Sequence, residues 1–397
     1  MKIDVPARRY GLDDPSSYFD LKSDEGYEAI RAARSDQLKG VYAERARMPR
    51  TWGVVEAARM IGRSRQWVQS KGGGDSVNES GNQRYSLGRI NELRKMANTL
   101  YQRPKNSKPF IIALSKLKGG VGNTTLAVHL AHKLAMMGLK VLCVDFDLQA
   151  STTMILGNVN PEVDLTDEDC PNYALTSDIE SYADIIRPTY FHNVWLAPCN
   201  ASLMDLEMSL TQEVERDTSD YLHDKQGNPI YPYNRLEHAL GSVRDDYDVI
   251  LIDCAPSLGI LTGNALTVAD SLINPLKPSA MDRASYAMFN ASMSSFYDTL
   301  DNKTLRYFRV AITQWAASKS TDEEEKKLRE WHTDYVLRHN IKHNAEIKNA
   351  PSQMSTVYEL EEPISNRETY TKALKTLNGA CDEIYADLCA IWELESA

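Results

Sequence analysis

Short apolar runs rich in β-branched residues recur through residues 108–397, with helix-type spacing of apolar residues between them. Strands that alternate with helices are typical of βαβ units, whose strands form a parallel sheet covered by helices. The pattern therefore predicts an α/β domain with a mostly parallel sheet flanked by helices. The expected strands are 110–114, 141–144, 194–197, 249–252, 271–274 and 308–313.

Two further segments precede this domain. Residues 1–48 are expected to form an N-terminal extension, in which 26–48 carry apolar residues at the spacing of a long amphipathic helix. That helix has no core of its own, so we expect it to pair with the same helix of a second chain. Pro49 ends it, a compact unit follows over 49–101, and a proline-containing linker leads into the α/β domain.

The compact unit has the pattern of a helix-turn-helix. A short amphipathic helix is predicted over 54–60, then a tight turn around Gly62, then a second helix for which Ser64 is a suitable N-cap. Residues 82–86 resemble the wing of winged helix-turn-helix domains. The expected DNA contacts are Ser64, Arg65, Gln66, Gln69 and Lys71 on the second helix and Arg84 in the wing. An all-α packing unit without DNA is the alternative.

Charge supports a polyanion partner for this unit. The chain carries a net charge of −10, yet residues 41–110 hold 14 Lys and Arg against 5 Asp and Glu, a local balance of +9. A basic block in an acidic protein indicates contact with nucleic acid. No apolar run approaches the roughly 20 residues of a membrane span, and the start lacks a signal peptide, so a cytoplasmic location is expected. The six cysteines show no metal-ligand spacing and are expected to be buried thiols.

A glycine-rich loop between the first predicted strand of the α/β domain and the next helix has the context of a phosphate-binding loop. Glycines let backbone N–H groups turn inward, and the helix N-terminus adds the positive end of its dipole. Thr124 is placed to join a Mg²⁺ shell. The expected nucleotide contacts are Lys118, Gly119, Gly120, Val121, Gly122, Asn123, Thr124 and Thr125.

These residues resemble the deviant Walker A motif of the ParA/MinD family, K-G-G-x-x-K-[ST], and the resemblance runs from Phe110 to the C-terminus. It implies a P-loop NTPase fold, ATP or ADP with Mg²⁺, and a dimer around two nucleotides. Lys118 matches the signature lysine that reaches the partner's nucleotide, and is an expected catalytic residue. Asn123 departs from the motif, because the family has there the lysine that contacts the β- and γ-phosphates. Asparagine brings no charge, so we expect binding to survive and hydrolysis to be impaired.

Two acidic motifs complete the expected site. Asp145 and Asp147 end a predicted strand, where residues two apart point the same way. They resemble the family's D-x-D-P-Q motif, with Leu148 in place of proline. The resemblance implies that Asp147 orients the attacking water and that Asp145, with Thr124, belongs to the metal site. Asp253 matches the Walker B aspartate, expected to hold Mg²⁺ through water. A solvated strand end is the alternative for the pair.

Other matches are looser. Asn264 falls where the family places an asparagine after Walker B, and Thr313 and Gln314 are expected adenine contacts; each has a simple loop alternative. A DNA-binding unit before such a P-loop resembles the larger ParA subgroup of low-copy plasmids and some secondary chromosomes. That subgroup also binds DNA non-specifically in the ATP state through basic residues near the C-terminus. Candidates are Lys348 and Lys375, and further Arg338, Lys342, Arg367 and Lys372, most of which suit a solvated surface equally.

The resemblance implies a ParA-type partition protein. An ATP-bound homodimer would coat nucleoid DNA, and a ParB-like centromere-binding partner would trigger release. Asn123 favours an alternative, a nucleotide-gated DNA-binding repressor that does not hydrolyse ATP. A metabolic P-loop enzyme would leave the helix-turn-helix unexplained. A MinD-like membrane-bound regulator is disfavoured on two grounds. We expect no amphipathic helix at the C-terminus, and residues 382–397 are acidic and would be repelled by anionic lipid.

Overall fold

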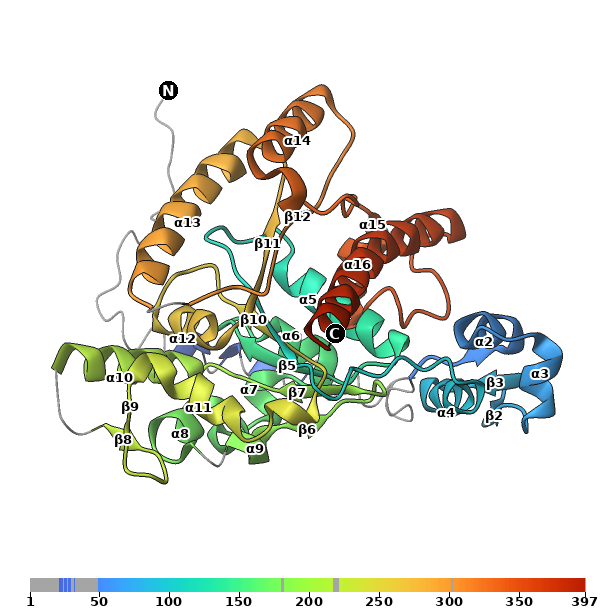
Figure 1. Ribbon diagram of the computed structural model, residues 1–397, viewed down its shortest axis with the longest axis horizontal. Helices are drawn as coiled ribbons and strands as arrows, with labels where there is room; N and C mark the ends of the chain where they lie inside the picture. The colour runs from blue at the N-terminus through green and yellow to red at the C-terminus, as the bar shows by residue number, and fades with distance from the viewer. Residues whose placement is uncertain are drawn as a thin grey trace, which may run out of the picture.

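The computed structural model describes residues 21–23, 25, 26, 28, 29, 32, 49–179, 182–216, 221–300 and 303–396. The amphipathic helix predicted over 26–48 lies, apart from four isolated positions, outside the described residues, and its pairing stays a prediction. Figure 1 shows a large domain built around a sheet and a small unit, residues 49–101, at its side.

A seven-stranded sheet forms the centre of the large domain. Its strands are β4 (Phe110–Leu114), β5 (Val141–Phe146), β6 (Arg187–Pro188), β7 (Val194–Ala197), β10 (Val249–Cys254), β11 (Ser271–Leu276) and β12 (Tyr307–Ile312). Their order is β12-β11-β4-β10-β5-β7-β6, and only the edge strand β6 runs antiparallel. Six of these strands coincide with the predicted ones, which confirms the α/β class with a mostly parallel sheet.

Both faces of the sheet are buried, because successive side chains of a strand point to opposite faces. Phe110, Ile112 and Leu114 join one apolar cluster, and Ile111 and Ala113 join the other. The first cluster is covered by α5 (Asn123–Met137) and α16 (Arg367–Ser396), and the second by α10 (Leu203–Arg216), α11 (Arg235–Gly241), α12 (Ile260–Val268) and α13 (Ala280–Asp298).

Shorter elements connect these layers. They are α6 (Ser151–Gly157), α7 (Pro161–Asp164), α8 (Pro171–Thr176), α9 (Tyr182–Ile185), α14 (Lys319–His332), α15 (Ala345–Asn349) and the hairpin of β8 (Leu222–His223) and β9 (Pro229–Ile230). The cysteines are spread through the interior. Five of the six are buried and Cys389 is half-buried, as predicted for isolated thiols.

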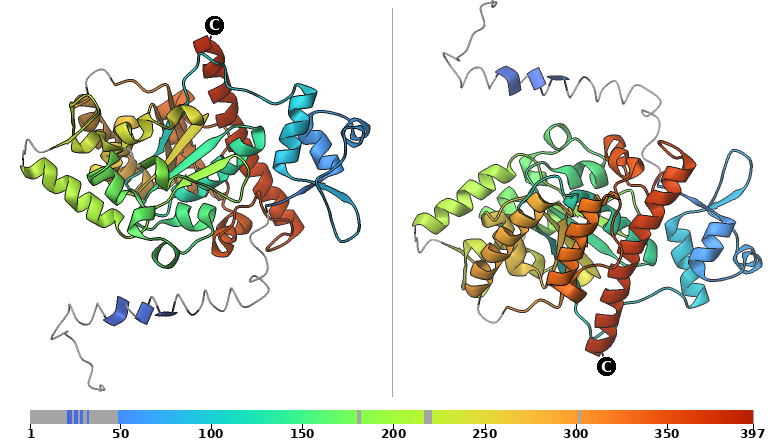
Figure 2. Two further views of the ribbon diagram at one scale, coloured as in Figure 1. Left: turned by 90° about the horizontal axis from the view of Figure 1, so that it is seen from below. Right: turned by 90° about the horizontal axis from the view of Figure 1, so that it is seen from above.

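The C-terminal helix α16 buries an apolar side that includes Leu377, Ile384, Leu388 and Trp392. Figure 2 shows it lying between the sheet and the N-terminal unit. The Trp392 indole Nε1 donates to the Lys108 carbonyl oxygen at 2.8 Å. The prediction that the chain has no amphipathic C-terminal helix is therefore wrong, because α16 has one apolar side, and that side is covered by the protein itself. In the described chain no helix is both long and apolar enough to cross a bilayer.

In the N-terminal unit the first two of three helices are joined by a tight turn, and three short strands form a small antiparallel sheet. Gly62 has φ 72°, which a residue without a Cβ adopts readily. The Ser64 hydroxyl accepts a hydrogen bond from the backbone N–H of Trp67 and so caps the second helix, as predicted. The elements are β1 (Trp52–Gly53), α2 (Val54–Ile61), α3 (Arg65–Ser70), β2 (Ser76–Val77), β3 (Gln83–Tyr85) and α4 (Leu87–Ala97).

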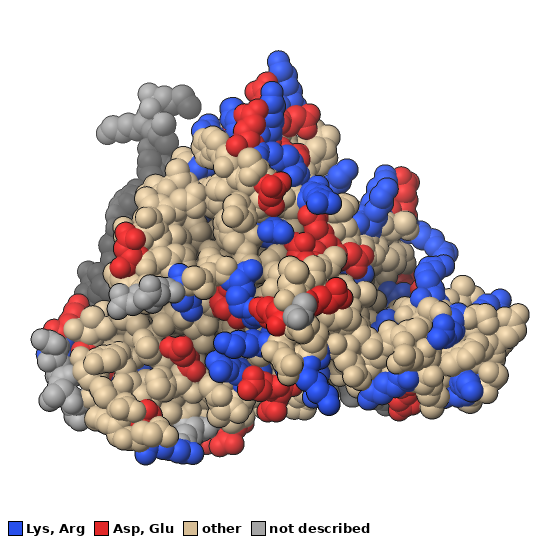
Figure 3. Space-filling model, in the orientation of Figure 1, with Lys and Arg blue, Asp and Glu red and all other residues tan. Residues whose placement is uncertain are grey.

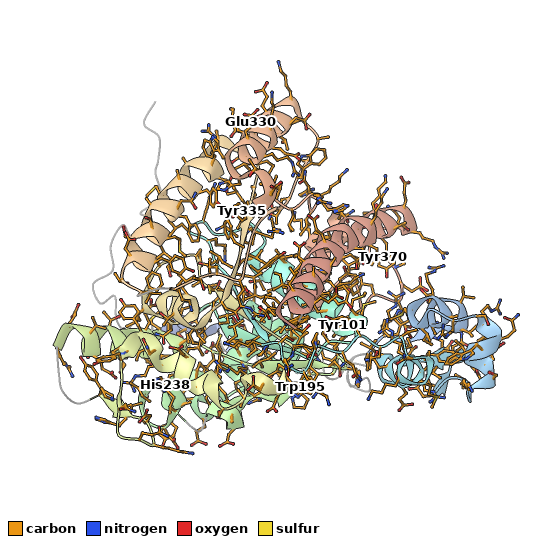
Figure 4. The ribbon with its side chains drawn as sticks, in the orientation of Figure 1. Tyr101, Trp195, His238, Glu330, Tyr335 and Tyr370 are labelled. Atoms are coloured by element: carbon orange, nitrogen blue, oxygen red, sulfur yellow. The ribbon has the colours of Figure 1, made fainter. Side chains whose placement is uncertain are left out.

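Two arginines fasten this unit to the large domain. The buried Arg94 donates through Nε to the Met60 carbonyl oxygen at 3.0 Å and through Nη1 to the Met136 carbonyl oxygen at 2.7 Å. Arg50 donates to the hydroxyl of Tyr370, labelled in Figure 4, at 2.7 Å. A buried guanidinium that is hydrogen-bonded on both sides fixes orientation, so the unit is held against the C-terminal end of α5.

Candidate nucleotide-binding site

The glycine loop connects β4 to α5 in the geometry of an anion cradle. Gly120 and Gly122 have φ values of 70° and 88°, which turn the backbone into a left-handed conformation that favours glycine. Helix α5 begins at Asn123, and the backbone N–H groups of its first turn have no partner within the helix. Together they place N–H donors and the positive end of a helix dipole at one point, which suits phosphate.

The end of β12 holds the loop in place. The Thr313 hydroxyl donates to the Val121 carbonyl oxygen at 2.6 Å, and the Gln314 amide donates to the Gly120 carbonyl oxygen at 2.9 Å. With these two carbonyl groups engaged, the orientation of the loop peptides is fixed. The structure therefore brings both residues to the loop, as supports of its backbone.

A cavity of about 400 Å³ opens beside the loop. Its lining includes Gly122 and Thr125 of the loop, Gln314, and the basic residues Lys342 and Lys348. The cavity is large enough for a nucleobase and adjoins the point where the phosphates would lie. Adenine contact by Gln314 stays a prediction, with this cavity as its location.

Asn123 is buried and its amide is drawn toward the sheet. Its Nδ2 donates to Asp253 Oδ1 at 2.6 Å, to the Leu114 carbonyl oxygen at 2.9 Å and to the Cys254 carbonyl oxygen at 3.3 Å. Its Oδ1 is buried and has no hydrogen-bond partner among the described residues. The side chain thus links the phosphate loop to the end of β10 and leaves one acceptor oxygen for a cation or a donor.

Asp253 is the common acceptor of the site. Besides Asn123, Thr152 donates its hydroxyl to Asp253 at 2.7 Å, and Thr124 also hydrogen-bonds to it. Burial raises the pKa of Asp253, while the nearby Lys116 and the two threonine hydroxyls act in the opposite direction. A buried carboxylate beside the Thr124 hydroxyl is the pair of protein oxygens expected for Mg²⁺ on a nucleotide.

Asp145 and Asp147 also lie here, in different surroundings. Asp145 is the register partner of Asp253, and its Oδ2 accepts from the N–H and the hydroxyl of Thr153, both at 2.7 Å. Burial, and then the charge of Asp253, raise the pKa of Asp145 to about 7. Asp147 follows the strand, and its Oδ1 accepts from the N–H of Gln149 at 3.1 Å. Asp145 lies beside Asp253 on the neighbouring strand with its Oδ2 held by Thr153, and its place in the metal site stays a prediction.

The pKa of Asp145 predicts a proton linked to metal binding. A cation beside Asp253 favours ionised carboxylates, so binding of a Mg²⁺-nucleotide at pH 6.5 should release up to about one proton, and affinity should rise with pH up to about 7. The stability of the free protein depends on pH in the opposite direction. The contribution of Asp145 to the free energy of unfolding is fully present below its ordinary pKa of 3.8 and is lost as pH rises through about 7.

Titration calorimetry at pH 6.5 in two buffers of different ionisation enthalpy measures the released proton, with Mg²⁺ in excess so that the nucleotide has none to lose. At pH 8.5 the two buffers should give the same enthalpy. Equal enthalpies at pH 6.5 would contradict the linkage.

Comparison with known proteins places this site in a family. Residues 110–306 match the family model described as an AAA domain. The protein SopA of Escherichia coli strain K12 is 30% identical over 391 residues, which cover 93% of this chain and 96% of SopA. The chain belongs to the ParA/MinD family of P-loop ATPases. A putative replication protein A of Rhizobium rhizogenes is 29% identical, and the match covers 86% of this chain and 88% of that protein.

A solved structure shares the ParA/MinD fold at lower identity. The putative plasmid partition protein of Borrelia burgdorferi B31, bound to AMPPNP, is 22% identical with a TM-score of 0.53. The match covers 70% of this chain and 99% of that protein. It supports the P-loop fold of the large domain.

The site fits a Mg²⁺-nucleotide as ParA/MinD proteins would hold it. The loop of α5 offers N–H donors, and Thr124, Asp253 and the unpartnered Asn123 Oδ1 offer oxygen. Among the described residues no three His, Cys, Asp or Glu side chains form a metal site by themselves. Mg²⁺ bound to a nucleotide is commonly held by one or two protein oxygens together with phosphate oxygens.

The signature lysine of the family is engaged within this chain. The Lys118 Nζ lies 3.0 Å from Oδ1 of Asp282, a buried residue in the first turn of α13. Ser279 donates its hydroxyl to the other carboxylate oxygen. The contact of Lys118 with a second chain and its catalytic role stay predictions.

One predicted nucleotide contact is wrong. Asn264 lies inside α12 and is fully buried; its amide donates to the carbonyl oxygens of Pro232 and Ile260 and accepts from the N–H of Leu236. These bonds pack α12 against α11, and none of them leaves a group for a ligand. The sequence analysis missed Thr152, Thr153 and Asp282, which meet the site only through the tertiary fold.

The residues predicted to contact DNA divide into two groups. The residues Ser64, Arg65, Gln66, Gln69 and Lys71 are all exposed in and around α3. Figure 3 shows Lys and Arg side chains with few acidic ones over the N-terminal unit. Their DNA contacts stay predictions.

The other basic candidates differ in setting. Arg84 is half-buried: its Nε donates to the Thr51 hydroxyl at 3.0 Å, and Nη2 reaches Glu361 at 3.4 Å. Arg84 thus braces the protein internally, and its predicted wing contact with DNA stays a prediction. Lys348 lines the cavity beside the phosphate loop, and Lys375 is exposed on α16.

Proposed function

We propose that this chain is a ParA-type partition protein that binds ATP or ADP with Mg²⁺, binds DNA, segregates a plasmid or chromosome and represses its own partition operon. The observation that carries the proposal is that one chain combines a phosphate-binding loop with a basic N-terminal unit. The phosphate cradle of α5 is complete, and a basic unit with an exposed capped helix is fastened to the other end of the same helix. Relatives with partition names support the same role.

Nucleotide binding rests on the cradle and the cavity. The phosphates would lie on the N–H groups at the start of α5, Mg²⁺ on Thr124 and Asp253, and the base in the cavity bordered by Gln314. Asp147, at the end of β5, would orient the attacking water. Solved relatives of this fold have been described with ATP or with AMPPNP bound.

DNA binding rests on the N-terminal unit. The exposed N-terminal end of α3 presents Arg65 and Gln66, side chains that read base edges in the major groove. We propose that this surface recognises an operator and that the ATP-bound homodimer also binds DNA non-specifically. A ParB-like protein would stimulate release, and the protein would work in the cytoplasm on the nucleoid.

A second candidate function is favoured by Asn123. Its amide is neutral and committed to Asp253, so position 123 contributes no charge to the transition state of phosphoryl transfer. We propose that hydrolysis is slow for this reason. If it does not occur at all, the chain would be a nucleotide-gated DNA-binding repressor.

Two measurements on the unmodified chain test these proposals. Retention of random-sequence DNA on a filter should rise at least about tenfold with Mg²⁺-ATP over Mg²⁺-ADP, because a partition protein couples DNA affinity to the triphosphate. Slow phosphate release that requires Mg²⁺ should accompany it. ATP-dependent retention without any phosphate release would select the repressor, and equal retention with ATP and ADP would refute both functions.

A further inference from the structure

One ammonium group in the site is not used by the family motif. Lys116 lies just after β4 and only 6% of its surface is exposed. Its Nζ donates to the Cys254 carbonyl oxygen at 3.1 Å, and its charge acts on the neighbouring Asp253. A lysine buried this far normally has a specific charged partner, because desolvation of an ammonium is costly.

Lys116 and Asn123 converge on the same atom. Both side chains donate to the Cys254 carbonyl oxygen, from opposite ends of the phosphate loop. The Asn123 amide ends there with its Oδ1 buried and unpartnered, an acceptor that suits an ammonium or a metal and not a phosphate oxygen. A positive charge, absent from Asn123, is therefore present beside it on Lys116.

The charges of the site explain why one ammonium is held there. Asp145, Asp147 and Asp253 lie together and are buried, and Lys116 is the cation whose charge acts on Asp253. Mg²⁺ bound at Asp253 would neutralise that carboxylate. The flexible four-carbon stem of Lys116 would then allow its ammonium to bind the nearest other anion, the phosphates on the adjacent cradle.

We propose that Lys116 supplies the positive charge that the phosphate loop lacks at position 123, as a ligand of the nucleotide phosphates. The proposal rests on the nucleotide binding proposed above. The competing explanation is that Lys116 only balances the buried aspartates, in which case its loss would lower stability and leave nucleotide affinity unchanged.

The test compares four proteins by titration with fluorescent ATP and ADP analogues in Mg²⁺, and by thermal melting without nucleotide. Lys116→Met should weaken ATP binding by about 10- to 100-fold, the size expected for one hydrogen bond to a charged group. The exchange variant Lys116→Asn with Asn123→Lys should recover affinity to within about threefold of the parent. Lys133→Met, which removes another buried lysine of the described chain, from α5 outside the site, should bind as the parent does.

The outcomes separate the two proposals. If Lys116→Met binds ATP as tightly as the parent, or if a folded exchange variant fails to recover, the role of Lys116 is overturned while nucleotide binding stands. If the parent itself binds neither nucleotide, the proposed function fails. If Lys116→Met does not fold, the variant Asn123→Lys provides the test. A gain in ATP affinity of less than about threefold supports the proposal, because the site already has its cation. A gain of about tenfold or more overturns it, because the site then lacked one.

Discussion

Asp253→Ala should lower Mg²⁺-dependent ATP turnover by at least about a hundredfold and abolish the effect of Mg²⁺ on nucleotide affinity. The carboxylate accepts hydrogen bonds from Asn123 at the end of the phosphate loop and from Thr152. Its removal takes away the expected Mg²⁺ partner, the shortest hydrogen bond of Asn123 and the acceptor of the buried Thr152 hydroxyl. Phosphate release and fluorescent-nucleotide titration, each with and without Mg²⁺, measure the two effects.

A matched control is Asp205→Ala, which removes an exposed aspartate from α10 and should leave both measurements unchanged. The melting temperature must be recorded for both variants, because loss of a buried hydrogen-bond acceptor also lowers stability. Turnover within about threefold of the parent, from a folded Asp253→Ala protein, would show that Mg²⁺ is held elsewhere.

The double variant Arg65→Ala with Gln66→Ala should weaken binding to DNA from the promoter region of the chain's own gene by about a hundredfold, since each contact with a base edge contributes about 1–3 kcal/mol. Both side chains are exposed at the start of α3, where they carry little of the fold. Fluorescence anisotropy at fixed salt, with promoter and random-sequence DNA, measures the change.

Arg59→Ala is the control for charge, because Arg59 is an exposed arginine of the same unit on α2. It should weaken both DNAs slightly and equally, as loss of a non-specific charge does. If the double variant also weakens both DNAs equally, α3 contacts only the backbone and the proposed operator recognition is wrong.

Most of the sheet could be predicted from the sequence, because its strands are buried on both faces and read as continuous apolar runs. Strand β6 was not predicted because it has only two residues, one of them Pro188, and pairs only at the sheet edge. The packing of α16 could not be predicted because its apolar side is defined by contacts with α5 and Phe110, which are distant in sequence.

The loop and its aspartates could be predicted because each lies directly at the end of an apolar run. The surroundings of these residues could not, because they arise from parallel pairing between segments far apart in the chain. Asp145 and Asp253 are register partners across 108 positions of sequence, and Lys116 reaches the Cys254 carbonyl oxygen only because β4 and β10 are neighbours. The nucleotide contact predicted for Asn264 failed for the same reason. It rested on a match to a family position, and the packing that buries Asn264 inside α12 was not visible in the sequence.

The attachment of the N-terminal unit bears on how this protein can be divided. One continuous apolar cluster includes Leu93 and Ala97 of α4, Leu134 of α5 and Trp392 of α16. Cutting the chain within the 102–109 linker would therefore split a shared interior and expose both halves of it to water. The N-terminal unit is built into the large domain rather than appended to it. Neither its deletion nor its transplantation onto another ATPase should therefore yield two independently stable modules.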